Sequence, residues 1–281
     1  MTRRAFLRLG AIATVRACGP RVPPLGRETS ARRIAYGRAS ESQFGELLLP
    51  KGPGPHPVAA VVHGGLWLAS YDLSLMAPLC EALVERGIAT WNVEYRRLGD
   101  DGGGWPGTFR DVGAAIDHLA TLAPSHGLDL GRVVTVGHSA GGHLALWTAA
   151  RPRIPAASEL AGAGLVRPRA AVSLAGVPDL VRAFEHGFDV VSRLLGGSPA
   201  EVPERYAIAS PAALLPLGVR QVLVHGTDDR IVPFAFSEDY VAAAVARGDD
   251  VRLVPLEGGG HFEPIDPESP ALRTIVESVS A

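Results

Sequence analysis

The sequence is poor in cysteine and lysine and has no long hydrophobic run. Among its 281 residues are two cysteines, Cys18 and Cys80, too few for a disulfide framework, and one lysine, Lys51. No Cys/His spacing predicts a metal site, and no apolar run approaches the roughly 18 residues of a membrane-spanning helix. Lys and Arg total 27 against 29 Asp and Glu, which leaves no basic excess to bind a phosphate backbone. We therefore expect no metal, no transmembrane helix and no nucleic-acid partner.

The overall composition is that of a globular protein. Hydrophobic residues make up 47 % and charged residues 20 % of the chain, which excludes disorder, collagen and coiled coil. The length fits one α/β domain with a sizeable core. The sequence carries no signal for an oligomeric state.

Basic residues concentrate at the N-terminus. Residues 1–33 contain eight arginines and a single acid, Glu28. The segment Thr2-Arg3-Arg4-Ala5-Phe6-Leu7, with the apolar stretch after it, resembles a twin-arginine export signal, and Cys18 resembles a lipoprotein cleavage site. We expect residues 1–27 to direct export to the periplasm or beyond, with a lipid anchor at Cys18 as one variant. A disordered tail on a cytoplasmic protein is the alternative.

The rest of the chain, residues 28–281, alternates between apolar strands and helical segments. Strands are predicted at 58–63, 88–95, 132–136, 170–174, 221–225 and 251–255, helices at 73–86, 109–122, 140–150 and 234–247, and an antiparallel strand pair within 33–49. Fully apolar strands that alternate with helices indicate a mostly parallel sheet covered on both faces, so the fold class is α/β. Residues 177–216 interrupt the alternation with several prolines and short helical pieces, and we interpret them as an insertion in one domain.

A nucleophile motif lies between the predicted strand at 132–136 and the helix at 140–150. The residues Gly137-His138-Ser139-Ala140-Gly141 form a G-x-S-x-G pattern in the strand-to-helix setting that gives this pattern meaning. Glycines beside Ser139 allow a tight turn that presents the hydroxyl at the carboxyl end of the sheet. The alternative for Ser139 is an ordinary helix cap.

A serine nucleophile needs a base and an acid, and both are found later in the chain. His261 follows the last predicted strand in a glycine-rich loop, and Asp228 and Asp229 follow the preceding strand. Serine, then aspartate, then histidine is the chain order expected of a Ser-His-Asp hydrolase of this fold. Such a triad requires no metal or organic cofactor.

These motifs resemble a known superfamily. His63-Gly64-Gly65-Leu66-Trp67, Asn92-Val93-Glu94-Tyr95-Arg96, the block from Gly137 to His143, the block from His225 to Pro233 and Gly260-His261-Phe262 are similar to α/β-hydrolases of the acetyl-esterase, feruloyl-esterase-like (BD-FAE-like) and arylformamidase-like group. The resemblance implies an α/β-hydrolase fold, with the 177–216 insertion over the active site. It selects Asp229 over Asp228 as the acid, and it implies an oxyanion hole of backbone N–H groups at Gly65, Leu66 and Ala140.

Aromatic residues are the candidates for the substrate pocket. They are Trp67 and Trp105, for which a place in the core is an equal alternative, and Phe184, Phe188 and Tyr206 in the insertion. His63, His138, His143 and His225 are expected to support the loops of the site rather than to act as bases.

The triad predicts acyl transfer but leaves the substrate open. The leading hypothesis is a serine hydrolase of carboxylic esters with small or medium acyl groups. The alternatives are an arylformamidase-like enzyme acting on N-formylkynurenine, a prolyl-oligopeptidase-like peptidase, and a catalytically silent binding protein. Export favours the first hypothesis, because polymer-derived esters are met outside the cytoplasm.

Overall fold

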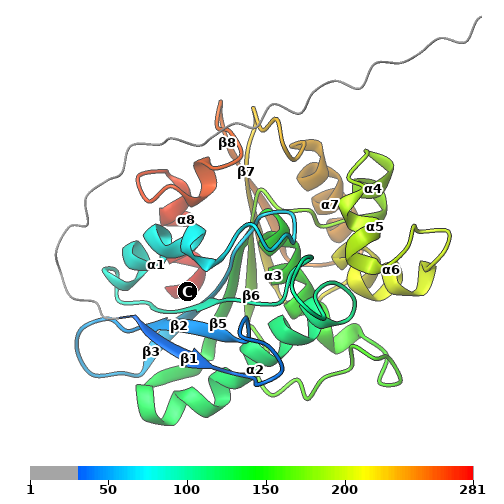
Figure 1. Ribbon diagram of the computed structural model, residues 1–281. Coiled ribbons are helices and arrows are strands. Elements are labelled where there is room, and N and C mark those ends of the chain that lie inside the picture. Colours follow the sequence, from blue (N-terminus) through cyan, green and yellow to red (C-terminus); the bar gives the residue numbers. More distant parts are fainter. Residues whose placement is uncertain (1–30, 281) are drawn as a thin grey trace, which may run out of the picture.

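A single mixed sheet forms the centre of the molecule. The computed structural model describes residues 31–280, so the predictions for residues 1–27, Cys18 included, lie outside the described residues. Its eight strands are β1 (Arg32–Ala35), β2 (Phe44–Leu48), β3 (His56–Val62), β4 (Ala89–Val93), β5 (Leu128–His138), β6 (Ala170–Leu174), β7 (Arg220–Gly226) and β8 (Val251–Leu256). Figure 1 shows the sheet running through the molecule with helices on both sides.

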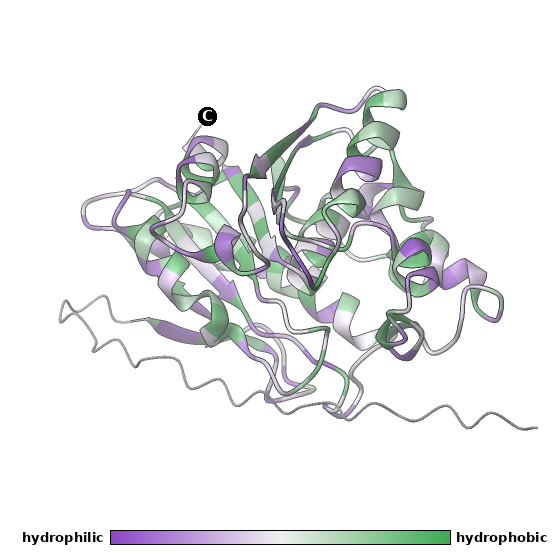
Figure 2. Cartoon of the chain, turned by 90° about the horizontal axis from the view of Figure 1, so that it is seen from above, coloured by the Kyte–Doolittle hydropathy of each residue, from purple (hydrophilic) through white to green (hydrophobic). Residues whose placement is uncertain are grey.

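The strand order explains where the site must lie. The order is β1-β2-β4-β3-β5-β6-β7-β8. The pairs β1–β2 and β2–β4 are antiparallel, and all pairs from β4 to β8 are parallel. The inner strands are buried on both faces, as their apolar runs predict, and hydrophobic colouring predominates along them in Figure 2. Parallel strands place their carboxyl ends on one edge of the sheet, so the loops after β3, β5 and β7 meet there. The α/β prediction and the antiparallel pair at the N-terminal end are confirmed.

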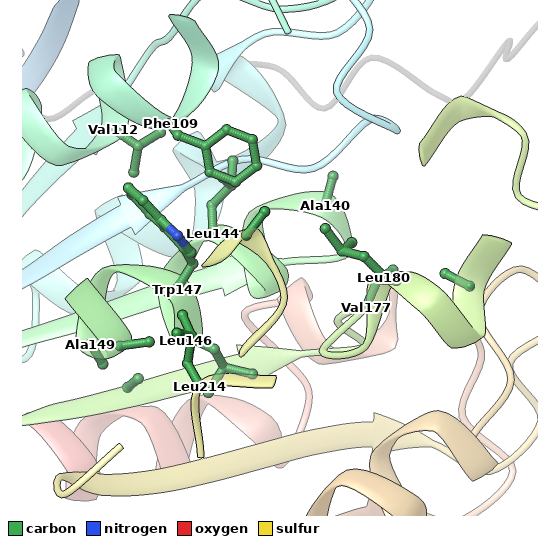
Figure 3. Close-up of a cluster of buried hydrophobic side chains, with 14 of the residues drawn as sticks. Phe109, Val112, Ala140, Leu144, Leu146, Trp147, Ala149, Val177, Leu180 and Leu214 are labelled. Carbon is green, nitrogen blue, oxygen red and sulfur yellow. The ribbon is translucent and has the colours of Figure 1, made fainter. Parts of the chain in front are cut away.

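Helices cover the two faces unequally. One face carries α1 (Ala77–Val84) and α8 (Ala271–Ser280), whose apolar residues pack on β3, β5, β6 and β7. The other face carries α2 (Gly107–His126), α3 (Ala140–Ala150) and α7 (Ala235–Ala246). Figure 3 shows Phe109 of α2 beside Trp147 of α3. Their ring centroids are 5.1 Å apart, so the two helices pack on each other through these aromatic side chains.

The insertion at 177–216 is tied to the helix that follows Ser139. It consists of α4 (Leu180–Glu185), α5 (Val190–Leu195), α6 (Pro203–Ala209) and the 3-10 turn η3 (Pro211–Leu214). His143 Nε2 donates to Ala209 O at 2.9 Å and Trp147 Nε1 donates to Ile208 O at 3.0 Å. Two ring N–H groups one turn apart on α3 thus fix the insertion against the core.

Two predicted helix boundaries are wrong. The helix expected at 109–122 begins at Gly107 and continues to His126, with Pro124 inside its last turn. Gly127, at φ 60°, ends it. The helix expected at 73–86 is divided into a 3-10 turn, η1 (Leu73–Met76), and α1, and Pro78 stands in the first turn of α1. Two further 3-10 turns complete the fold. One, η2 (Arg151–Arg153), follows α3, and the other, η4 (Glu263–Ile265), follows His261.

Candidate active site

Ser139 occupies a sharp turn between β5 and α3. Its φ and ψ of 54° and −119° are a conformation that non-glycine residues rarely adopt. A Cβ added at Gly137 would lie 2.0 Å from Gly141 O, and one at Gly141 would lie 2.1 Å from Val62 O. Both positions therefore require glycine, as the motif predicts.

The backbone at Ser139 gives a stability prediction. Because alanine is strained at this φ and glycine is not, Ser139→Gly should be more stable than Ser139→Ala by about 1 kcal/mol, although both lack the hydroxyl. Urea unfolding of the two variants measures the difference. If Ser139→Ala were instead the more stable variant by about 0.4–1 kcal/mol, the usual entropic advantage of alanine over glycine, the turn would store no strain.

Asp229 and His261 form a buried pair at the same edge of the sheet. His261 Nδ1 donates to Asp229 Oδ2 at 2.7 Å, and the Asp229 carboxylate is fully buried. Asp228 is exposed, so the geometry places Asp229, and not its neighbour, beside the histidine.

Four donors surround the Asp229 carboxylate. Its Oδ1 accepts from the backbone N–H groups of Ile231 and Val232 at 2.8 and 2.9 Å, and its Oδ2 accepts from His225 Nε2 at 3.1 Å as well as from His261. Burial raises the pKa of Asp229, but the hydrogen bonds from His225, His261 and Ile231 outweigh it and hold the pKa well below its usual range. The carboxylate is thus kept ionised, as a partner for an imidazolium should be.

His138 connects the loops that carry Ser139 and His261. Its Nε2 donates to His261 O at 2.9 Å, and the two imidazole rings are 4.7 Å apart. Burial and the neighbouring charge of His261 lower the pKa of His138 to about 3, so the ring stays neutral near neutral pH. Within residues 31–280, no hydrogen bond joins the Ser139 hydroxyl to His261; such bonds are often longer before substrate binds.

The loop after β3 runs against the turn at Ser139. A Cβ added at Gly64 would lie 2.7 Å from His138 O and 3.0 Å from Ser139 Cβ, so only glycine fits. The N–H groups of Gly65 and Leu66 donate no hydrogen bond to the described part of the chain, and Ala140 is the first residue of α3. Unpartnered N–H groups at a helix start and in an adjacent loop can stabilise an anion.

The aromatic pocket candidates lie in different surroundings. Trp67 is 1 % exposed and lies edge-on to His143 within the core, which favours its core alternative. Trp105 donates to Glu159 Oε1 at 2.6 Å, Phe188 packs on Phe236, Phe184 is half-buried on α4, and the Tyr206 hydroxyl donates to Gly197 O. A groove of about 440 Å³ between α2, α3 and residues 159–165 is lined by none of the candidate site residues.

Three exposed apolar side chains beside the site were not among the predicted pocket residues. Phe262 is 52 % exposed with its ring 5.2 Å from that of His261, Ile231 follows Asp229 by two residues, and Tyr71 Cβ lies against Gly65. Phe262 and Ile231 could have been predicted from the sequence, because they stand within two residues of His261 and Asp229. They are better placed than the buried tryptophan to meet an apolar substrate.

His143 is fully buried, and burial lowers its pKa to about 4. The unfolded chain takes up the proton near pH 6.5, so it binds more protons than the folded chain between about pH 6.5 and 4. The free energy of unfolding should therefore fall as the pH decreases through this window, by roughly 3 kcal/mol from His143. Urea unfolding at several pH values tests this, and His143→Leu should reduce the slope by the share of His143 and leave that of His138. An unchanged slope in the variant would contradict it.

Curated relatives match most of the chain. The probable isoprenylcysteine alpha-carbonyl methylesterase of Oryza sativa subsp. japonica is 29 % identical over 267 residues, which is 88 % of this chain and 62 % of the relative. The isoprenylcysteine alpha-carbonyl methylesterase of Arabidopsis thaliana is 26 % identical over 249 residues, which is 83 % of this chain and 56 % of the relative. The chain therefore spans little more than half the length of these curated relatives.

Solved structures and a family model agree on the fold. A truncated carbohydrate esterase from gut microbiota superposes with a TM-score of 0.78 at 20 % identity, covering 90 % of this chain and 97 % of the other. A thermophilic esterase from Thermogutta terrifontis has a TM-score of 0.71 at 22 % identity, covering 89 % and 90 %. The BD-FAE family model matches residues 46–243, the stretch from β2 into α7 that carries Ser139 and Asp229. The fold and the resemblance expected from the sequence are confirmed: this chain is an α/β-hydrolase and belongs to the BD-FAE family.

Proposed function

We propose that this protein is a serine hydrolase that cleaves carboxylic esters of small or medium acyl groups. The observation that carries the proposal is the buried Asp229–His261 pair, 2.7 Å apart, whose loop is bonded through His138 to the turn that presents Ser139. The esterase names of the curated relatives and structural neighbours support the same reaction class.

In each half of the proposed reaction His261 acts first as a base and then as an acid. His261 Nε2 takes the Ser139 proton as Oγ attacks the ester carbonyl, and Asp229 holds the Nδ1–H and stabilises the imidazolium. The N–H groups of Gly65, Leu66 and Ala140 donate to the oxyanion, each worth roughly 3–4 kcal/mol. His261 returns the proton to the departing alkoxide. Water, deprotonated by His261, then attacks the acyl carbon, and His261 returns this proton to Ser139 Oγ as its bond to the acid breaks.

A substrate series separates the candidate reactions. We would compare p-nitrophenyl esters from acetate to decanoate with N-formylkynurenine and with a prenylated cysteine methyl ester, the last because of the relatives' names. Ser139-dependent turnover of short esters is the expected result, and the chain-length optimum measures the acyl site. A strong preference for the formamide would replace the ester proposal with the arylformamidase alternative.

We also propose that the protein is exported. The proposal rests on the pattern around Arg3 and Arg4. The change Arg3→Lys with Arg4→Lys keeps the charge and should retain the protein in the cytoplasm, because the signal is read as an arginine pair. Fractionation of cells that express both forms measures this. Equal distribution of the two forms would favour the cytoplasmic alternative.

None of the helices within residues 31–280 is long and apolar enough to cross a membrane.

A further inference from the structure

The loop between β3 and η1 has a backbone that other residues must hold in place. Gly65, Leu66 and Trp67 are three successive residues with positive φ, of 108°, 56° and 55°. Left-handed conformations of non-glycine residues cost about 1–3 kcal/mol each and persist only where the surroundings impose them. The same residues include two of the proposed oxyanion donors, so whatever holds this loop also sets the direction of those N–H groups.

Glu94, just after β4, binds both ends of this loop. Its side chain is 3 % exposed. The carboxylate accepts from His63 Nε2 at 2.9 Å on Oε1, where the loop begins, and from Leu73 N at 3.1 Å on Oε2, where the loop ends. Tyr95 N and Arg97 Nη1 also approach Oε1, at 2.9 and 3.1 Å. One buried carboxylate therefore has four donors and connects the loop to β4.

Neighbouring residues extend this network along the loop. The Tyr95 hydroxyl donates to His63 O at 2.9 Å, and the Tyr95 ring stacks on the His63 ring at 4.5 Å. Arg97 donates to Tyr71 O, and Leu98 N donates to Trp67 O at 2.7 Å. The loop is thus held from the side of β4 along most of its length.

The contact that matters for chemistry is on the other side of the His63 ring. His63 Nδ1 lies 2.7 Å from Gly64 O, and Nε2 faces the Glu94 carboxylate. Both partners are acceptors, so the ring donates to both when each of its nitrogens carries a proton. Gly64 C=O and Gly65 N–H belong to one peptide group, so a bond to this oxygen fixes where the Gly65 N–H points. A hydrogen bond accepted by a peptide carbonyl also strengthens the N–H of that peptide as a donor.

We propose that Glu94 is a positioning residue for the oxyanion hole. Through His63 it orients and polarises the Gly64–Gly65 peptide, so that Gly65 N–H is directed at the carbonyl oxygen of the substrate as negative charge develops there. This assigns a role to the Asn92-Val93-Glu94-Tyr95-Arg96 motif, and it rests on the serine esterase function proposed above.

Glu94→Gln tests the proposal with little change of shape. All four partners of the carboxylate are donors, so the amide NH2 of glutamine must face at least one N–H group and release it. We expect kcat for p-nitrophenyl acetate to fall about 10- to 100-fold with little change in KM, because the oxyanion donor is misplaced in the transition state.

A sulfur-substituted substrate separates positioning from a general structural defect. Sulfur accepts hydrogen bonds weakly, so the thiono analogue of p-nitrophenyl acetate, with C=S in place of C=O, gains little from the oxyanion hole. Glu94→Gln should lower turnover of the oxygen ester much more than that of the thiono ester, and their rate ratio should fall about tenfold or more. A structural defect lowers both rates equally.

Two further variants serve as controls for Glu94→Gln. Glu46→Gln, a half-buried glutamate on neighbouring β2, should leave the ratio unchanged. Should Glu94→Gln fail to fold by circular dichroism, Tyr95→Phe decides, since it removes only the hydroxyl bond to His63 O and should lower the ratio in the same direction. A folded variant with an unchanged ratio overturns the role of Glu94. Full activity of Ser139→Ala in the same assay would instead overturn the proposed function.

Discussion

Replacement of Ser139 by alanine is expected to lower kcat for ester hydrolysis by about 10⁶-fold while the protein remains folded. The variant removes the only atom that would form the acyl intermediate, and it leaves β5, α3 and the Asp229–His261 pair in place. Residual turnover above buffer would come from the oxyanion donors and from substrate binding alone. Initial rates with p-nitrophenyl acetate measure the loss, and circular dichroism confirms the fold.

Ser173→Ala is the matched control for this prediction. Ser173 pairs with Gly137 across β6 and β5, so it lies beside the turn of Ser139, and it is equally buried. Its hydroxyl has no hydrogen-bond partner within the described residues, and its loss should change activity little. If Ser139→Ala kept activity close to that of Ser173→Ala, Ser139 could not be the nucleophile.

The second large effect is expected at Asp229. Asp229→Asn should lower kcat by about 10⁴-fold, because an amide NH2 that faces His261 Nδ1 favours the tautomer that cannot accept the serine proton at Nε2. The side chain is fully buried and nearly the same in shape, so substrate binding should change far less than kcat. Steady-state kinetics of the variant separate the two parameters.

Asp228→Asn controls for the loss of a charge in the same turn. Asp228 is adjacent in the chain but exposed, and it makes none of the four hydrogen bonds that hold Asp229. Its replacement should leave kcat within about twofold. A larger loss at Asp228 than at Asp229 would reverse the assignment of the acid.

Local structure was predicted best where the pattern of residues permits only one conformation. The helix at 140–150 and the strand at 170–174 were predicted to the residue, since continuous apolar runs between clear breaks leave little choice. Gly137 and Gly141 marked the turn at Ser139 because backbone atoms of other segments occupy the space of any Cβ. The chain order of Ser139, Asp229 and His261 matched the order expected of a Ser-His-Asp hydrolase of this fold.

Features that depend on distant contacts were not predictable in this way. Trp67 could line a pocket or fill the core, and only its packing against His143 on another element favours the core. Glu94 was part of a motif without a role, because its partners His63 and Leu73 are 31 and 21 residues away in the chain. Pairing across such distances is set by the strand order, which local patterns do not contain.

Ser139 is tested most directly as the nucleophile by finding the residue that a serine-directed probe modifies. The full chain would be treated with a fluorophosphonate, and its adduct located by peptide mass spectrometry. Structures of the Thermogutta terrifontis esterase after reaction with tabun and with sarin show that a protein of this fold forms such organophosphorus adducts. We expect one adduct, on Ser139, which forms slowly in Asp229→Asn and not at all in Ser139→Ala. An adduct on another residue, or equal labelling of Ser139→Ala, would contradict this expectation.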